Sequence, residues 1–218
     1  MINLLPTLGF GFALGIKHAV EADHLIAVST MLSEHKNPYR AALIGTFWGI
    51  GHTSTLFIVG LGVLLLRISI PEATTQKLEL LVAVMLIILG IQSLYKRSQV
   101  HEHEHRHGEM IHIHMHQNHT HQHRKSFIIG SLHGFAGSGA LMILVLSLIK
   151  TVWEGIVYII IFGIGSTLGM TIVSLVIGIP FSKSLKAFAS AEKFLRLGMG
   201  TLSILFGIYI LTEVLLNL

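Results

Sequence analysis

The stretch GIKHAVEADHLIAV, residues 15–28, decides how the rest of the sequence is read, because it sets ionisable side chains inside an apolar segment. They are Lys17, His18, Glu21, Asp23 and His24. The surrounding apolar run extends from residue 2 to residue 32. An ionisable residue inside a membrane helix costs roughly 2.5–3.5 kcal/mol on insertion scales, so such residues point to function. The role of these charges therefore depends on whether the run crosses a membrane.

Composition indicates a membrane protein. The chain is 52% hydrophobic and 12% charged, with a mean hydropathy of +0.71, whereas soluble domains carry about 25% charged residues. A bilayer-spanning helix needs roughly 20 mostly apolar residues. Six such runs predict an all-α membrane protein with six transmembrane helices. The runs are 2–32, 40–66, 78–95, 126–149, 155–179 and 194–216.

The chain ends and the missing residue types narrow this further. There is no cysteine, which excludes disulfides, thiolate metal sites and thiol redox chemistry. The N-terminus lacks a basic n-region and a small-residue cleavage site, so we expect no removable signal peptide.

The positive charges predict the orientation. Lys and Arg gather near 33–39, 96–125 and 180–193, three loops that share one side if six helices alternate. By the positive-inside rule this side is cytoplasmic. Both termini then lie outside, and the long middle loop lies in the cytosol. Clustering in alternate loops also argues against a nucleic-acid partner, despite the net charge of +4.

The sequence repeats itself over three pairs of segments, in the same order in each half. An odd number of helices per repeat inserts the second repeat upside down, and inverted repeats are a transporter architecture with the substrate site near the midplane. We therefore expect two inverted three-helix repeats, 1–95 and 126–218, joined by the loop 96–125. The pairs are FALGIKHAVEADHL (12–25) with FIIGSLHGFAGSGA (127–140) at offset 115, FWGIGHTS (47–54) with IFGIGSTL (161–168) at offset 114, and ILGIQSLY (88–95) with LFGIYILT (205–212) at offset 117.

The opening stretch offers metal ligands. His18, Asp23 and His24 carry imidazoles and a carboxylate, which suit Ni²⁺, Co²⁺ or Zn²⁺. On a straight helix of ~100° per residue, Asp23 lies roughly 140° and His24 roughly 240° around from His18. Either the helix is broken at the motif, as a polar cavity allows, or one of the three is not a direct ligand. Lys17 and Glu21, four apart, are predicted to pair on one helical face.

Further candidates lie outside this motif. His52, in WGIGHTST, is a predicted fourth ligand beside Thr53, the alternative being a histidine that packs between helices. His133 repeats His18 in the second half, but the following GFAGSGA, with Ser138, carries no carboxylate. His133 therefore ranks lower. The predicted site is asymmetric and is carried mainly by the first repeat.

The middle loop is rich in histidine. Residues 101–123 hold ten of the fifteen histidines, interspersed with Glu and Met, and such tracts bind metals. We expect a weakly selective metal buffer or sensor without fixed structure, the alternative being a pH-responsive linker. The ten are His101, His103, His105, His107, His112, His114, His116, His119, His121 and His123.

Two segments resemble a known family. KHAVEADH (17–24) resembles the first signature of the nickel/cobalt transporter (NiCoT) family, and FWGIGHTS (47–54) resembles its second. The resemblance implies uptake of Ni²⁺ or Co²⁺, with His18, Asp23, His24 and His52 recognising the metal. Larger members have eight spans and carry Asp-Thr pairs in later signatures. With six runs, HGFAGSGALM and GIGSTLGM, this chain is more similar to the short urease-associated nickel permease (UreH-like) branch.

Together these features predict Ni²⁺ uptake, with Co²⁺ as a second cargo, through a multi-pass protein of a bacterial inner membrane. The ion is the substrate, and no prosthetic group is expected. Efflux of the same ions is one alternative. An intramembrane zinc enzyme is another, although no His-Glu-x-x-His motif is present. No Gly-rich ATP-binding loop is present either, so a gradient or a partner drives transport. Expected partners are the bilayer and a cytosolic metallochaperone or a urease or hydrogenase maturation system.

Overall fold

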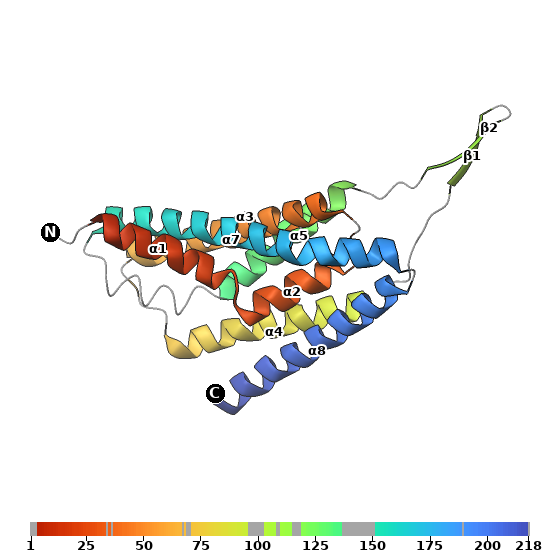
Figure 1. Cartoon of the computed structure of the whole chain (residues 1–218). Coiled ribbons are helices and arrows are strands. Elements are labelled where there is room, and N and C mark those ends of the chain that lie inside the picture. Colours follow the sequence, from red (N-terminus) through yellow and green to blue (C-terminus); the bar gives the residue numbers. More distant parts are fainter. Residues whose placement is uncertain are drawn as a thin grey trace.

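The chain folds into an elongated bundle of helices (Figure 1). The computed structural model describes residues 4–33, 35, 37–66, 68, 71–95, 103–107, 110–114, 119–136, 151–188 and 190–217. The helices within this part are α1 (Leu4–His18), α2 (Ala22–Leu32), α3 (Pro38–Leu66), α4 (Glu72–Tyr95), α5 (His119–Ala136), α7 (Val152–Ala187) and α8 (Ala191–Asn217).

Several of these helices can cross a bilayer. Among the described residues, four helical stretches are long and apolar enough, namely Pro38–Leu66, Thr74–Tyr95, Val152–Ala187 and Ala191–Leu216. Large apolar side chains such as Ile58, Val176 and Leu205 are exposed on their outer faces. Such a surface is unfavourable in water and suits contact with lipid. The chain is therefore a multi-pass, essentially helical membrane protein.

The first apolar run is broken where the sequence predicts. α1 ends at His18, and the amides of Val20 and Glu21 donate to the carbonyls of Lys17 and His18 at 3.1 Å each. These tight turns bend the chain before Leu25 resumes helical bonding to the carbonyl of Glu21 at 3.0 Å. The fifteen residues of α1 span only about 22 Å, less than the ~30 Å hydrocarbon core. α1 and α2 therefore act as two short pieces rather than as one spanning helix.

α2 lies in the middle of the bundle. Ala27 and Leu32 on α2 are completely buried, in a core cluster that also contains Trp48 of α3, Leu86 of α4 and Met170 of α7. α2 lies against α4, α7 and α8, between α7 on one side and α4 and α8 on the other (Figure 1). This packing fixes α2 although it is only eleven residues long.

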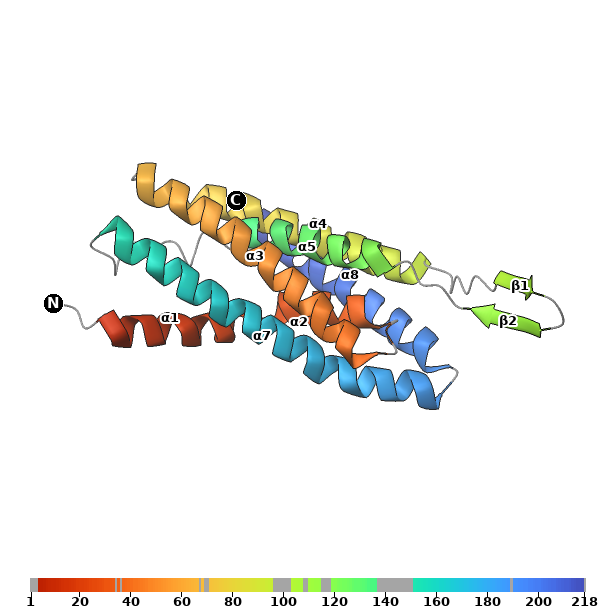
Figure 2. The ribbon, with the colours of Figure 1, turned by 90° about the horizontal axis from the view of Figure 1, so that it is seen from above.

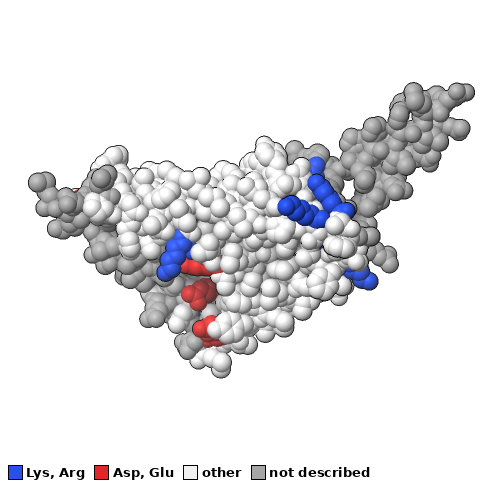
Figure 3. All heavy atoms as spheres, viewed as in Figure 1, with Lys and Arg blue, Asp and Glu red and all other residues white. Residues whose placement is uncertain are grey.

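The polar connections gather at one end of the bundle. The α2–α3 connection, the α7–α8 connection and the hairpin of β1 (His103–His107) and β2 (Met110–His114) all lie there (Figures 1 and 2). We call it the hairpin end. On the face shown in Figure 3, Lys and Arg gather at this end, whereas the carboxylates lie toward the other end, where a basic side chain lies beside them. The three loops predicted to share a side thus lie together.

The hairpin itself was not foreseen. β1 and β2 pair antiparallel, with His103 opposite His114 and His107 opposite Met110. The hairpin and the first turns of α5 fall within residues 96–125, where the sequence predicts no fixed structure. The boundaries of this loop and of the two halves stay predictions.

Helices of the two halves pack in close pairs. α1 lies against α7, and α5 against α3. A Cβ added at Gly15 of α1 would overlap the Phe162 carbonyl of α7, and one added at Gly130 of α5 would overlap the Trp48 carbonyl of α3. Glycine at these positions lets the backbones approach, as is typical of membrane helices.

The pair α4 and α8 shows the same feature. A Cβ at Gly90 of α4 would lie 2.5 Å from the carbonyl oxygen of Gly200 in α8. A Cβ at Gly207 of α8 would lie 2.8 Å from the carbonyl oxygen of Ala83 in α4. Larger residues at Gly90 or Gly207 would therefore push these two helices apart.

Candidate metal site

Four histidines from four helices meet inside the bundle. His18 ends α1, His24 lies in the first turn of α2, His52 is on α3 and His133 is on α5. Each is buried, with at most 6% of its surface exposed. The break between α1 and α2 brings His18 and His24 together, with ring centroids 4.6 Å apart. On a straight helix these two side chains would point in different directions, whereas the break lets them face each other.

The side chains of His18, His24 and His52 form one group. Each offers a ligand nitrogen, and these atoms all lie within 4.8 Å of one another. The Nε2 atoms of His18 and His52 are 3.1 Å apart, a hydrogen bond in which one nitrogen carries the proton. His24 Nε2 and His52 Nδ1 are buried and find no partner among the described residues. Buried nitrogens without partners are unusual and invite a ligand.

Asp23 links His24 to the second half of the chain. Its Oδ2 accepts a hydrogen bond from His133 Nε2 at 2.9 Å. Its Oδ1 accepts one from the backbone amide of His24 at 2.9 Å and lies 3.1 Å from His24 Nδ1. Asp23, His24 and His133 form a second group with ligand atoms within 4.8 Å of one another, so His24 belongs to both groups.

Glu21 also contacts a histidine of the cluster. His18 Nδ1 lies 2.8 Å from Glu21 Oε2, and the Glu21 side chain is 51% exposed. The prediction that Glu21 pairs with Lys17 is wrong for the described residues, because α1 ends at His18. The spacing of four brings two side chains together only on a continuous helix.

Aromatic rings enclose the imidazoles. The Trp48 ring stacks on His24 with centroids 6.2 Å apart and lies 5.8 Å from the ring of His133. Phe162 of α7 lies 5.7 Å from His18. Trp48 is completely buried. These walls keep the cluster in a low-dielectric setting, where charges interact more strongly than in water.

The remaining predicted residues lie elsewhere. Thr53 Oγ1 donates to the Gly163 carbonyl and lies 3.1 Å from Thr167 Oγ1, so it joins α3 to α7. Ser138 lies outside the described residues. Of the ten loop histidines, only the side chain of His123 is described, and its ring lies 4.7 Å from that of Phe47.

His133 lies closer to the cluster than the sequence suggested, since its ring centroid is 4.1 Å from that of His24. The cluster therefore includes one residue of the second half, whereas His18, Asp23, His24 and His52 come from the first. The sequence did indicate that His133 belongs to the cluster, because His133 aligns with His18 at the repeat offset of 115. The aromatic walls, Trp48 and Phe162, were missed. Trp48 and Phe162 occupy equivalent positions at offset 114, so the alignment of the two repeats could have identified them as a pair.

Comparison with known proteins shows the family of the chain. No solved structure matches the chain significantly. The chain is 41% identical over 209 residues to the urease accessory protein UreH of Bacillus sp. (strain TB-90), covering 95% of this chain and 91% of that protein. Residues 4–218 match the family model NicO, described as high-affinity nickel-transport protein. The chain therefore belongs to the NicO family, a family of nickel transporters rather than of enzymes.

Proposed function

We propose that the chain carries Ni²⁺, with Co²⁺ as a second cargo, into the cytoplasm, and that His18, His24 and His52 bind the ion in transit. The observation that carries this proposal is the meeting of three buried imidazoles from three helices, with ligand nitrogens within 4.8 Å of one another. Imidazole is a favoured ligand of divalent nickel, copper and zinc.

The spacing suits a single ion. Two nitrogens bound to one ion at ~2.0–2.1 Å, the distance known for zinc, lie at most about 4.2 Å apart. The widest separation here is no more than 4.8 Å. Bringing the widest pair to this limit requires up to roughly 0.6 Å of movement, and ligands that do not lie directly opposite each other on the ion require more.

The carboxylates set the imidazole tautomers. When His24 donates from Nδ1 to Asp23 Oδ1 at 3.1 Å, its buried Nε2 keeps a free lone pair. When His18 donates from Nδ1 to Glu21 Oε2 at 2.8 Å, its Nε2 carries no proton and points a lone pair at His52. Carboxylates that orient ligating histidines are a common support of metal sites. The ion would take the place of the proton shared by His18 and His52.

The ends of the two short helices fit this role. His18 lies at the C-terminus of α1, where the helix dipole favours a cation, and Asp23 lies at the N-terminus of α2, where it favours an anion. Broken helices with paired ends at membrane depth form the ion sites of many transporters. The site would therefore hold cation and carboxylate side by side.

We further propose that the six spans form two inverted repeats that rearrange around this site. α1 runs from the N-terminal end toward the middle, and α5 runs toward the middle from the hairpin end (Figure 1). The same contact occurs twice at equivalent positions. Gly15 packs against Phe162, and Gly130, its equivalent at offset 115, packs against Trp48, the equivalent of Phe162 at offset 114. The fourth span is the run 126–149, of which α5 forms the described part.

Contacts between equivalent residues support the same symmetry. Thr53 and Thr167, 114 apart, meet with their hydroxyl oxygens at 3.1 Å. Ser203 donates to the carbonyl of Leu86, 117 apart, at 2.7 Å. Residues that contact their own repeat partner lie on the axis that relates the repeats. Such an axis would let the two halves rock against each other around the ion.

Orientation and partners follow from the charges. The hairpin end carries the basic loops, so we place it in the cytoplasm of a bacterial cell and both termini outside. The His-rich loop would collect the ion leaving the site. A relative is a urease accessory protein, which supports delivery to a urease maturation system or its metallochaperone.

Cell-associated nickel at submicromolar external Ni²⁺ tests the function and its direction. We expect nickel to rise with the intact chain and to stay at the vector level with His24→Ala. His35→Ala, which removes a buried histidine outside the cluster, should behave as the intact chain. Nickel below the vector level would make the chain an exporter. No change in nickel, cobalt or zinc would refute metal transport.

A further inference from the structure

A concave surface lies between α4 and α5, on the outside of the bundle. Its volume is about 480 Å³, and its walls are apolar, with Leu81 and Ile88 from α4 and Ile128 and Leu132 from α5. These four side chains remain exposed, so the apolar walls of the groove face outward from the bundle. In a membrane such a groove faces lipid.

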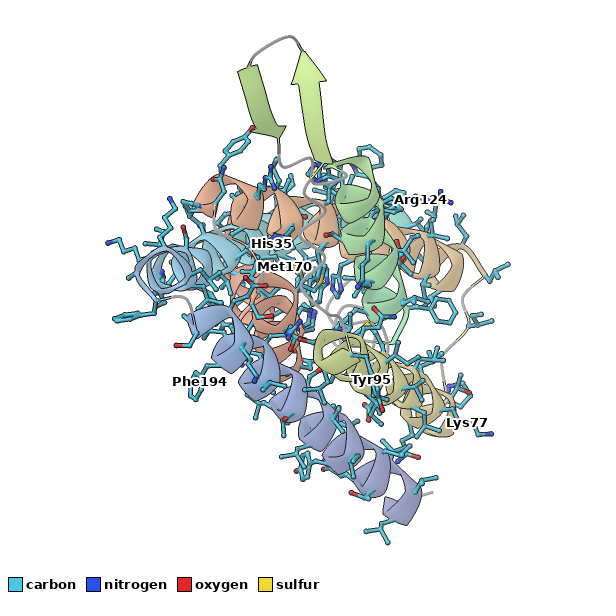
Figure 4. The ribbon with its side chains drawn as sticks, turned by 90° about the vertical axis from the view of Figure 1, so that its right-hand side faces the viewer. His35, Lys77, Tyr95, Arg124, Met170 and Phe194 are labelled. Atoms are coloured by element: carbon cyan, nitrogen blue, oxygen red, sulfur yellow. The ribbon has the colours of Figure 1, made fainter. Side chains whose placement is uncertain are left out.

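The hairpin end of this groove is polar and basic. Arg124 and Lys125 of α5 and Gln92 of α4 line it, and Lys125 Nζ donates to Gln92 Oε1 at 2.8 Å across the two walls. Arg124 and Tyr95 lie at this end of their helices (Figure 4). Tyr95 is 84% exposed. An exposed tyrosine at a helix end is typical of the membrane–water interface.

The length of the groove matches one leaflet. Leu81 and Gln92 both line it and are eleven residues apart on α4, which corresponds to about 16 Å. Half of the ~30 Å hydrocarbon core is about 15 Å. The basic end therefore lies at headgroup depth when the apolar end lies near the bilayer centre.

A comparable groove elsewhere on the bundle lacks this charge. It lies between α3 and α7, has a volume of about 570 Å³, and none of its described lining residues is charged. Its lining includes Ile50, Ile58, Ile164 and Leu168. Apolar walls alone are thus shared by both grooves, and the two cations distinguish the one between α4 and α5.

We propose that the α4–α5 groove binds one anionic phospholipid. Its phosphate lies against Arg124 and Lys125, and an acyl chain lies along Ile88 and Ile128. Basic pockets between transmembrane helices recognise anionic headgroups in this way. Leu132 of the groove wall directly precedes His133 of the cluster, so the lipid contacts the helix that supplies this histidine.

Lipid titration followed by native mass spectrometry tests this. The purified full chain in detergent is titrated with dioleoylphosphatidylglycerol or dioleoylphosphatidylcholine. The double variant Arg124→Gln with Lys125→Gln should weaken phosphatidylglycerol binding about 25-fold, at about fivefold for each cation, and leave phosphatidylcholine unaffected. The control pair Lys183→Gln with Lys186→Gln, exposed at the same end on α7, should bind both lipids as the intact chain does.

A second variant separates the groove from general charge. Ile88→Trp with Ile128→Trp fills the apolar walls and should weaken both lipids while all cations remain. Equal losses in the two charge variants, or tight phosphatidylglycerol binding without Arg124 and Lys125, would overturn the proposal. So would unchanged binding in the filled groove. Elution volume and nickel binding of each variant verify that the bundle is intact.

Discussion

Replacing Asp23 by asparagine tests how the carboxylate supports the histidines. Asp23 contacts His133 through Oδ2 at 2.9 Å and His24 through Oδ1 at 3.1 Å. Its side chain is only 25% exposed. Asparagine keeps the size and one oxygen, but it removes the charge and turns an acceptor into an amide that faces a histidine. The tautomer of His24 is then no longer fixed by a carboxylate.

The expected effect is large. Loss of a carboxylate that orients a ligating histidine lowers metal affinity about 10–100-fold, which is about 1.4–2.7 kcal/mol. Glu21→Gln is the matched control, because Glu21 also contacts a cluster histidine, at 2.8 Å, but is 51% exposed. Water screens such a pair, whose worth is about 0.2–1 kcal/mol, so we expect less than a fivefold change.

Equilibrium dialysis of nickel with the two purified variants measures both changes in affinity. We predict a dissociation constant 10–100-fold above that of the intact chain for Asp23→Asn, with the amount of folded protein unchanged. An Asp23→Asn protein that binds nickel as tightly as the intact chain would refute the reasoning. A larger effect from Glu21→Gln than from Asp23→Asn would refute it as well.

Three further predictions concern the second half, the packing and the orientation. His133→Ala should lower nickel affinity by about tenfold or more, as expected for a residue that holds Asp23. An unchanged dissociation constant in equilibrium dialysis would mean that only residues of the first half support the ion. Gly130→Ala should destabilise the bundle by about 1–3 kcal/mol, because its Cβ overlaps the Trp48 carbonyl, whereas Gly62→Ala, with open space around it, should leave the melting temperature unchanged or higher. Because the chain has no cysteine, Pro71→Cys should react with an impermeant thiol reagent in intact cells and Ser190→Cys only after permeabilisation; the reverse pattern would invert the topology.

The break in the first apolar run could be predicted from residue spacing. Three ligand-type side chains at 18, 23 and 24 cannot face one ion from a straight helix, and the helix does end at His18. The same reasoning should have removed the predicted pair of Lys17 and Glu21, which requires the unbroken helix. Two inferences from one segment were inconsistent, and the one based on angular geometry was correct.

The contribution of the second half could not be ranked from local sequence. His133 is surrounded by glycine and serine, and its partner Asp23 is 110 residues away. Only the packing of α5 against α3 brings His133 near this carboxylate. Local composition is silent about such contacts, whereas the repeat offset of 115 pointed to the residue. Alignment of the halves was thus more informative than the residues around His133.

The number of spans was only partly accessible from hydropathy. The sequence shows six apolar runs, and four helical stretches among the described residues are long enough to cross. The first run is divided into α1 and α2, each shorter than the bilayer core. Hydropathy averages over a window and does not register a break of three residues when the flanking segments stay apolar. The hairpin in the histidine-rich loop was missed although its second strand alternates Ile111 and Ile113 with His112 and His114, because the histidine-rich composition of the loop indicated a segment without fixed structure.

X-ray absorption at the nickel edge is the most direct test of the central claim, that the buried histidine cluster holds the transported ion. The full purified chain should bind a tight equivalent of nickel whose nearest shell contains three imidazoles. In His24→Ala this equivalent should be lost, while weaker binding to the loop histidines persists. Nickel held tightly without imidazole scattering, or retained unchanged in His24→Ala, would contradict the account.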